Sequence, residues 1–145
     1  MEFVHYSVML EECLDGLSIK PDGIYVDGTA GGAGHSAAIA AKLSPEGKLI
    51  AFDQDPDAVK TAGVRLSSYP NAQIVQENFR NMAGVLREMG VSGVDGVLLD
   101  LGVSSHQLDE AERGFSYLHD APLDMRMSQN GLSAYDVVNT WPADE

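Results

Sequence analysis

Short apolar runs alternate with amphipathic stretches along the first hundred residues of the chain. The apolar runs predict strands over residues 24–27, 48–53, 72–75 and 93–99. The stretches between them predict helices over 35–43, from Pro56 onward and over 79–89, because their apolar residues recur every three to four positions. Strands that alternate with helices are typical of βαβ units, so we expect an α/β fold with a parallel sheet.

Residues that start and stop helices support these boundaries. Asp55 is suited to cap the helix that has Pro56 at its first position. Gly90 is suited to end the helix that precedes it. Farther along the chain the periodicity fades, and we expect residues 102–127 to form an irregular loop and residues 133–141 to begin another helix.

The charge balance argues against a nucleic-acid-binding surface in this chain. The 145 residues hold 22 acidic and 9 basic side chains, for a net charge of −13. From Asp95 to the end, every basic residue is Arg113 or Arg126, whereas carboxylates are frequent. Because RNA binding requires clustered positive charge, we expect any RNA contacts to come from elsewhere.

The composition also indicates the compartment in which the protein acts. The longest apolar runs are far shorter than the roughly 20 residues of a membrane-spanning helix, and the one cysteine, Cys13, cannot form an internal disulfide framework. We therefore expect a single soluble domain, without a membrane partner, in the reducing cytoplasm. No metal site is expected.

Polar residues follow the predicted strands where each strand ends. Asp27, Asp53 and Asp100 close the first, second and fourth strands, and Asn78 and Phe79 follow the third. The carboxyl ends of parallel strands share one edge of the sheet, where open α/β folds bind their ligands. We expect these strand ends to converge on one crevice.

The loop from Gly28 to Gly34 and the strand-end Asp53 together predict an adenosine-containing cofactor. Glycines let the backbone approach a ligand closely, and amides at a helix start suit an anionic group. An acidic residue about 20 positions beyond the glycines is placed to accept hydrogen bonds from ribose hydroxyls. NAD remains an alternative, because residues 32–37 fit the G-x-G-x-x-A pattern. Against NAD, the glycines begin directly after Asp27, and an acid closing the first strand is typical of methyltransferases, where it helps to place the methionine part of the cofactor.

Several longer motifs make the chain resemble one family. The motifs are Asp27–Ser36, Leu98–Ser105, Gln107–Asp109, Glu112–Tyr117 and Pro122–Met127, with His5–Met9 as a matching opening. In this order and spacing they resemble the bacterial family that methylates the N(4) amine of a cytosine in 16S ribosomal RNA. The resemblance covers essentially the whole chain, and one departure is His106, where the family commonly has proline.

The resemblance implies a Rossmann-like class I S-adenosylmethionine-dependent methyltransferase fold that is truncated. Only the first four parallel strands, in the order 3-2-1-4 with flanking helices, would be present. Residues 1–127 would be the incomplete S-adenosylmethionine-binding core, and residues 128–145 the start of a helical substrate-recognition insertion. The fourth strand would then be an exposed edge through which a homodimer could form.

The resemblance also implies a cofactor site for S-adenosyl-L-methionine. Ala33, Gly34 and His35 would line the methionine end through the loop backbone, and Asp53 would bind the ribose. Phe79 would pack beside the adenine. Asp100 and Gln107 would complete the contacts.

The implied reaction is methylation of the exocyclic N(4) amine of a cytosine at the ribosomal decoding centre, within the small subunit. Asp100 is the candidate catalytic residue, as an acceptor for the amine proton. The usual D-P-P-Y-like tetrad is replaced by residues 100–103, which makes cofactor binding the safer role for Asp100. Most RNA contacts would lie outside this chain, so that the fragment would be weak or inactive alone. A non-catalytic cofactor-binding or assembly module is the alternative.

Overall fold

A computed structural model describes residues 7–144 of the chain. The chain divides after Asp100 into two compact units, the first ending at that residue and the second beginning at Leu101. The opening residues His5 and Tyr6 of the family resemblance lie outside the described part.

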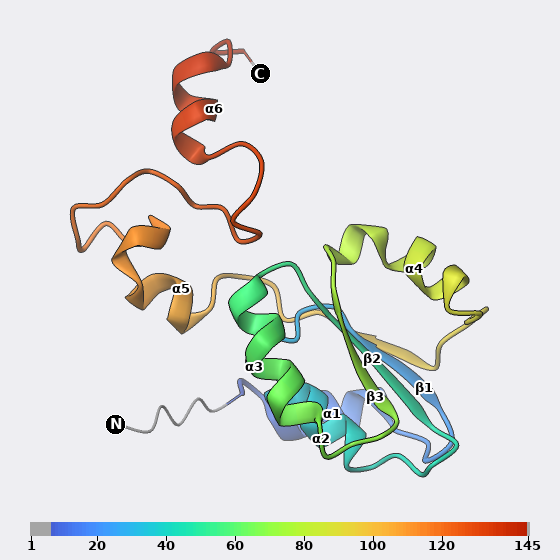
Figure 1. The fold of residues 1–145 in the computed structure, drawn as a ribbon. Helices are drawn as coiled ribbons and strands as arrows, with labels where there is room; N and C mark the ends of the chain where they lie inside the picture. Colours follow the sequence, from blue (N-terminus) through green and yellow to red (C-terminus); the bar gives the residue numbers. More distant parts are fainter. Residues whose placement is uncertain (1–6, 145) are drawn as a thin grey trace. The chain divides into compact units, whose positions relative to one another are not determined.

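The first unit contains a four-stranded parallel sheet (Figure 1). Its strands are β1 (Ile24–Asp27), β2 (Lys48–Asp53), β3 (Ala72–Gln76) and β4 (Gly96–Leu98). They lie in the order β3-β2-β1-β4, with every neighbouring pair parallel. The predicted strand order 3-2-1-4 is therefore confirmed, and β4 lies at an edge of the sheet.

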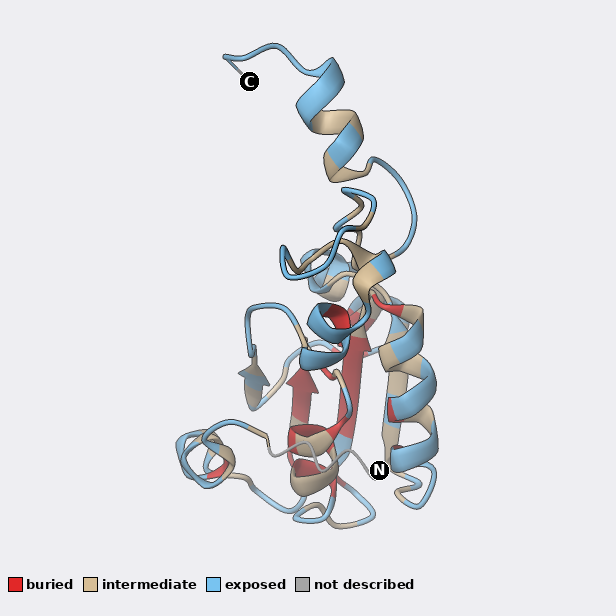
Figure 2. Cartoon of the chain, turned by 90° about the vertical axis from the view of Figure 1, so that its left-hand side faces the viewer, coloured by how far each residue is buried: buried red, intermediate tan, exposed pale blue. Residues whose placement is uncertain are grey.

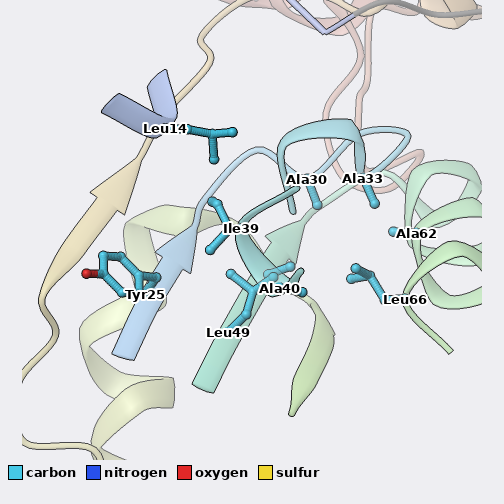
Figure 3. Close-up of a cluster of buried hydrophobic side chains, with 10 residues drawn as sticks. Leu14, Tyr25, Ala30, Ala33, Ile39, Ala40, Leu49, Ala62 and Leu66 are labelled. Carbon is cyan, nitrogen blue, oxygen red and sulfur yellow. The ribbon is translucent and has the colours of Figure 1, made fainter. Parts of the chain in front are cut away.

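Helices cover both faces of this sheet. They are α1 (Leu10–Leu17), α2 (Gly34–Ala40), α3 (Pro56–Leu66), the 3₁₀ turn η1 (Phe79–Asn81) and α4 (Met82–Glu88). On one face, Tyr25 and Leu49 of the strands pack with Leu14, Ile39 and Leu66 of α1, α2 and α3 (Figure 3).

The opposite face has its own cluster beneath α4. Val26, Ile50 and Phe52 of β1 and β2 pack there with Leu86 of α4 and with Val91. Residues of a strand alternate between faces, so the continuous apolar runs of β1 and β2 supply both clusters. Figure 2 shows that the buried residues concentrate in these central strands.

The helix boundaries follow the sequence signals closely. The side chain of Asp55 accepts a hydrogen bond from the amide of Asp57 at the start of α3, as expected of a cap. Gly90 has a φ of 74° just beyond α4, a left-handed conformation that glycine adopts without strain. The helix expected over 35–43 ends at Ala40, because the amides of Lys42 and Leu43 bond three residues back in tighter turns.

Strand β4 is shorter than the run of residues 93–99 that was predicted. Only Gly96–Leu98 pair with β1, and the side chain of Asp95 accepts the amide hydrogen of Ile24 at 3.0 Å, where the strand begins. The side chain of Val97 is 42% exposed. An apolar run can therefore be longer than the ladder it joins, because here the ladder ends with Asp27, the last residue of β1.

The second unit contains helices α5 (Ser105–Asp109) and α6 (Ala134–Thr140) and the 3₁₀ turn η2 (Ala111–Arg113). Helix α6 confirms the element expected at 133–141. The prediction of an irregular loop over 102–127 was wrong at α5, where Ser104 and Gln107 form a reciprocal capping box that stabilises a five-residue helix.

Two motifs of the second unit are joined by hydrogen bonds that backbone carbonyls accept. The carbonyl of Arg113 accepts a hydrogen bond from the amide of Met125 at 3.0 Å. The Nη2 atom of Arg113 donates to the carbonyl of Met127 at 3.1 Å, and Arg126 forms an ion pair with Asp124 at 2.6 Å. The motifs at 112–117 and 122–127 therefore form one folded element. In the described part of the chain, no helix is both long and apolar enough to cross a membrane.

Candidate functional site

The carboxyl ends of the strands in the first unit meet around the loop of residues 28–34. The amide of Gly28 donates to the carbonyl of Leu98 of β4, and the amide of Ala30 to the carbonyl of Phe52 of β2, both at 2.9 Å. A side chain added at Gly28 would meet Cβ of Phe79 at 3.2 Å, so Phe79, three residues beyond the end of β3, lies there too. The structure brings these strand ends together as the sequence predicted.

The conformation of this loop is fixed by side chains from neighbouring elements. The amide of Gly31 donates to Oδ2 of Asp53 at 2.8 Å, and Nη1 of Arg65 in α3 donates to the carbonyl of Gly32 at 3.0 Å. Gly31 and Ala33 have φ values of 50° and 58°. A left-handed alanine is uncommon and persists only where its surroundings hold it, so the loop is held in a defined shape at one of the predicted contact residues.

Asp53 is half-buried at the end of β2 and accepts hydrogen bonds from backbone amides, among them those of Gly31 and Asp55. Its Oδ2 accepts from Gly31, and its Oδ1 accepts from Asp55 at 2.9 Å. Burial is the main cause that raises the pKa of this carboxyl, against the lowering effect of the amide hydrogen bonds. Each carboxylate oxygen can accept more than one hydrogen bond. The geometry therefore leaves acceptor capacity for hydroxyl groups of a ligand.

Asp27, at the end of β1, is buried and hydrogen-bonded within the protein. Its Oδ2 accepts from Oγ of Ser36 at 2.6 Å, and its Oδ1 accepts from the amide of Thr29 at 3.1 Å. Burial, the largest effect, raises the pKa of this carboxyl. Asp27 is only 1% exposed, and its hydrogen bonds join the loop to α2; its expected part in placing the methionine end of the cofactor stays a prediction.

His35 and Gly34 contact the segment at the start of the described chain. Nε2 of His35 lies 2.9 Å from the carbonyl of Val8, and because a carbonyl only accepts, this nitrogen carries the hydrogen. A Cβ on Gly34 would overlap Oγ of Ser7. The side chain of His35 thus bonds within the protein. This leaves its backbone for the role that the family resemblance implies, which is to line the methionine end of the cofactor.

Phe79 and Asp100 are the exposed members of the site. The side chain of Phe79 is 37% exposed beside Gly28, which leaves part of the ring accessible. The side chain of Asp100 is exposed, and its amide donates to Oγ1 of Thr29 at 2.7 Å. An aromatic face and a carboxylate are therefore available at the same edge of the sheet.

Gln107, the remaining predicted cofactor residue, lies in the second unit. It is buried, with its Oε1 accepting from the amide of Ser104 at 3.0 Å. This capping box was missed at the sequence level, although a serine followed three residues later by glutamine is its signature. Thr29, Ser36 and Arg65 were also missed as residues that hold the site. Thr29 had a signal, because an aspartate two residues earlier favours a turn that binds its amide, whereas Arg65 had none.

Other features of the described residues do not offer a better site. Among residues 7–144, no three His, Cys, Asp or Glu side chains gather as a metal site would require. An open hollow of about 390 Å³ lies in the second unit, lined by Leu123, Asp124, Arg126 and neighbours. Its arginine is already bound to Asp124 through Nε and Nη2. We therefore assign the candidate site to the strand ends of the first unit.

Sequence comparison finds close relatives of the chain. The sequence profile of the MraW methylase family matches residues 2–145. Ribosomal RNA small subunit methyltransferase H of Clostridioides difficile (strain 630) is 60% identical over 147 residues, and its namesake from Clostridium botulinum (strain Kyoto / Type A2) is 57% identical over 146 residues. Both matches cover 100% of this chain and 47% of the relative. The chain thus spans about half the length of these curated relatives.

Solved structures share the fold at low identity. The C-terminal domain of precorrin-6Y C5,15-methyltransferase from Rhodobacter capsulatus matches with a TM-score of 0.56 and 16% identity, over 75% of this chain and 56% of that one. NSun6 from Pyrococcus horikoshii matches with a TM-score of 0.55 and 23% identity, over 67% of this chain and 24% of that one. These likenesses, with the strand order β3-β2-β1-β4, confirm the Rossmann-like methyltransferase fold expected from the sequence.

Proposed function

Since this chain belongs to the MraW methylase family, we propose that it is the S-adenosylmethionine-binding part of an enzyme that methylates ribosomal RNA of the small subunit. The finer proposal is that the methyl group goes to the exocyclic N(4) amine of a cytosine in 16S rRNA, at the decoding centre. The observation that carries the proposal is the strand-end site, where Asp53 and the loop of residues 28–34 are held together.

The residues of the first unit fit the parts of S-adenosylmethionine. Asp53 would accept hydrogen bonds from the ribose hydroxyls, a role that suits a carboxylate at the end of the second strand. The partly exposed ring of Phe79 would pack against the adenine. Ala33, Gly34 and the backbone of His35 would line the methionine end, and the shape that the loop holds at Ala33 supports this.

S-adenosylmethionine supplies an electrophilic methyl group on a sulfonium. The cytosine amine is a weak nucleophile because its lone pair is delocalised into the ring, so the protein must position it in line with the methyl group. In the proposed transfer the N–C bond would form as the S–CH3 bond breaks, the electron pair of that bond would stay on sulfur to leave S-adenosylhomocysteine, and the nitrogen would lose one proton. The exposed carboxylate of Asp100 would accept a hydrogen bond from the cofactor and is our candidate acceptor for the amine. Gln107, which the family resemblance implies as a further cofactor residue, stays a prediction.

RNA recognition is proposed to depend mainly on residues outside this chain. The net charge of −13 disfavours a phosphate backbone. We propose that residues 1–127 form the cofactor core and residues 128–145 the start of the substrate-recognition segment. The protein would act in the cytoplasm, and the chain alone would be weakly active or inactive on the small subunit.

A second copy of the chain is a further partner that we propose, along the free edge of β4. Val97 and Leu99 are 42% and 43% exposed there, and an unpaired edge strand offers backbone groups to another strand. Gel filtration with mass detection is expected to show a concentration-dependent dimer. A monomer at all concentrations would contradict this part of the proposal.

A chimaera tests the enzymatic proposal. This chain would replace the matching half of the Clostridioides difficile relative, and the product would be incubated with labelled S-adenosylmethionine and small ribosomal subunits that lack the modification. We expect labelled N(4)-methylcytosine from the chimaera and from the intact relative, and little from the chain alone.

A folded chimaera that leaves the RNA unlabelled, beside an active relative, would contradict the enzymatic proposal. It would favour a non-catalytic cofactor-binding or assembly module, the alternative that the acidic charge supports. The Asp53→Ala chimaera is the matched control, because it should lose labelling if the proposed ribose contact carries the cofactor. Label found on a different base would contradict only the N(4)-cytosine part.

A further inference from the structure

A continuous series of hydrogen bonds runs from the interior of the first unit to Asp100. Oγ of Ser36 in α2 donates to Asp27 at the end of β1, at 2.6 Å. The other oxygen of Asp27 accepts from the amide of Thr29, at 3.1 Å. Oγ1 of Thr29 then accepts from the amide of Asp100, at 2.7 Å. These hydrogen bonds thereby link one residue each from α2, β1 and the loop with Asp100, which lies two residues beyond β4.

The series passes from buried to exposed groups. Asp27 and Ser36 are 1% and 0% exposed, Thr29 is half-buried and Asp100 is exposed. Side chains packed in a core have little freedom to move, so Asp27 and Ser36 provide a fixed anchor. Thr29 connects this anchor to the backbone amide of Asp100, the residue that bears the strand-end carboxylate.

The hydrogen bond between Thr29 and the Asp100 amide matters because Asp100 lies beyond the paired part of β4. The last pair of the ladder joins Asp27 and Leu98, and the amide of Gly28 still donates to the carbonyl of Leu98. Beyond that pair the ladder stops, two residues before Asp100. The hydroxyl of Thr29 therefore takes the place of a strand partner for the Asp100 amide.

We propose that Thr29 is a positioning residue, whose hydroxyl sets the place of the Asp100 carboxylate at the cofactor site. This inference rests on the proposed function of that site. The hydroxyl oxygen is the group required, so serine should replace Thr29, whereas valine, which has the same shape without the acceptor, should not. Valine keeps the backbone amide that binds Asp27, so the anchor itself should survive.

Calorimetry with S-adenosylmethionine on the full 145-residue chain tests the inference. We expect Thr29→Val to weaken binding about three- to tenfold, the effect of one lost hydrogen bond, and Thr29→Ser to stay within about twofold of the unchanged chain. Thr29→Ala removes the hydroxyl without adding bulk and serves if the valine variant fails to fold. The matched control is Thr61→Val in α3, whose hydroxyl donates to the carbonyl of Asp57 on an exposed face.

Two readouts separate positioning from a general loss of structure. In the ligand-free chain, the Asp100 amide should exchange its hydrogen faster in Thr29→Val than in Thr29→Ser. In an Asp100→Ala background, Thr29→Val should weaken S-adenosylmethionine binding by no more than about twofold, because coupled residues are not additive. If Thr29→Val weakened S-adenosylmethionine binding as strongly in that background as in the unchanged chain, Thr29 would act by another route. That result would overturn the inference.

The failure of this inference can be told from that of the proposed function. If the unchanged chain does not bind S-adenosylmethionine, both are overturned. If it binds, and Thr29→Val binds equally well, Thr29 has no positioning role while the proposed function stands.

Discussion

At the scale of the residue, the site depends on carboxylates that differ in burial and in their hydrogen-bond partners. Asp27 is buried and accepts a hydrogen bond from Ser36, Asp53 is half-buried and accepts hydrogen bonds from backbone amides, and Asp100 is exposed. Burial raises the pKa of both Asp27 and Asp53. Three acidic residues that look equivalent in the sequence therefore have different roles: Asp27 holds the loop, whereas Asp53 and Asp100 are proposed to bind the ligand.

Substitution of Asp53 tests the proposed ribose contact. Asp53→Ala should weaken S-adenosylmethionine binding by about 10- to 100-fold, since two hydrogen bonds to a charged group are lost. Asp53→Asn keeps one acceptor oxygen and should lose less. Titration calorimetry measures both, with Asp15→Ala, an exposed acid in α1, as the control. Equal affinity for Asp53→Ala and the unchanged chain would contradict the ribose role.

The raised pKa of Asp53 gives a pH dependence of known sign. The ionised carboxylate accepts from two hydroxyls, and the protonated form accepts less well. Affinity for S-adenosylmethionine should therefore fall as the pH drops from neutral through the raised pKa of Asp53. The Asp53→Asn variant should lack this component when affinity is measured across the same pH series. Identical pH profiles for the two proteins would argue against an ionised Asp53 in the complex.

At the scale of the element, the sequence predicted what local pattern determines. The strands predicted from the apolar runs of β1 and β2 are confirmed, and so are the helix boundaries predicted at Asp55 and Gly90. These predictions succeed because burial and capping act over a few residues. The extent of β4 could not be predicted, since it depends on where β1 stops offering partners. The side-chain partner of His35, which is the carbonyl of Val8, is likewise set by tertiary packing.

Two glycines of the second unit allow a matched test of its packing. Gly114 and Gly131 have φ values of 73° and 79°, so alanine at either is strained. A Cβ at Gly114 would also overlap the carbonyl of Pro122, whereas a Cβ at Gly131 would meet no atom within 4 Å. We expect Gly131→Ala to destabilise this unit by about 1 kcal/mol, and Gly114→Ala by clearly more.

The chain has one tryptophan, Trp141, which lies in the second unit. Its fluorescence during urea unfolding measures the stability of that unit in both glycine variants. Equal losses for Gly114→Ala and Gly131→Ala would show that the contact between the motifs at 112–117 and 122–127 is loose.

At the scale of the whole molecule, the fold suits binding of the cofactor, whereas the charge does not suit binding of the RNA substrate. The Rossmann-like sheet and its strand-end site suit a nucleoside-containing cofactor. The net charge of −13 does not suit RNA. The chain matches 47% of the length of its curated relatives, which is consistent with the proposal that the RNA-binding surface lies mainly beyond these residues.

The charge leads to a prediction for RNA binding. The chain alone should bind a 16S rRNA fragment more weakly than about 10⁻⁴ M at physiological salt, below the usual range for non-specific binders. Fluorescence anisotropy with a labelled RNA measures this, with the intact Clostridioides difficile relative as the positive control. Micromolar binding by the chain alone would contradict our placement of the RNA contacts.

The central claim is that S-adenosylmethionine binds at the strand ends of the first unit. NMR titration of the 15.5 kDa chain tests it most directly, with S-adenosylmethionine and NAD added in separate experiments. We predict that S-adenosylmethionine shifts the amide signals of Gly31–His35, Asp53 and Asp100, and that NAD leaves them unchanged. Shifts confined to the hollow of the second unit, stronger shifts with NAD, or no shifts with either ligand would contradict the account.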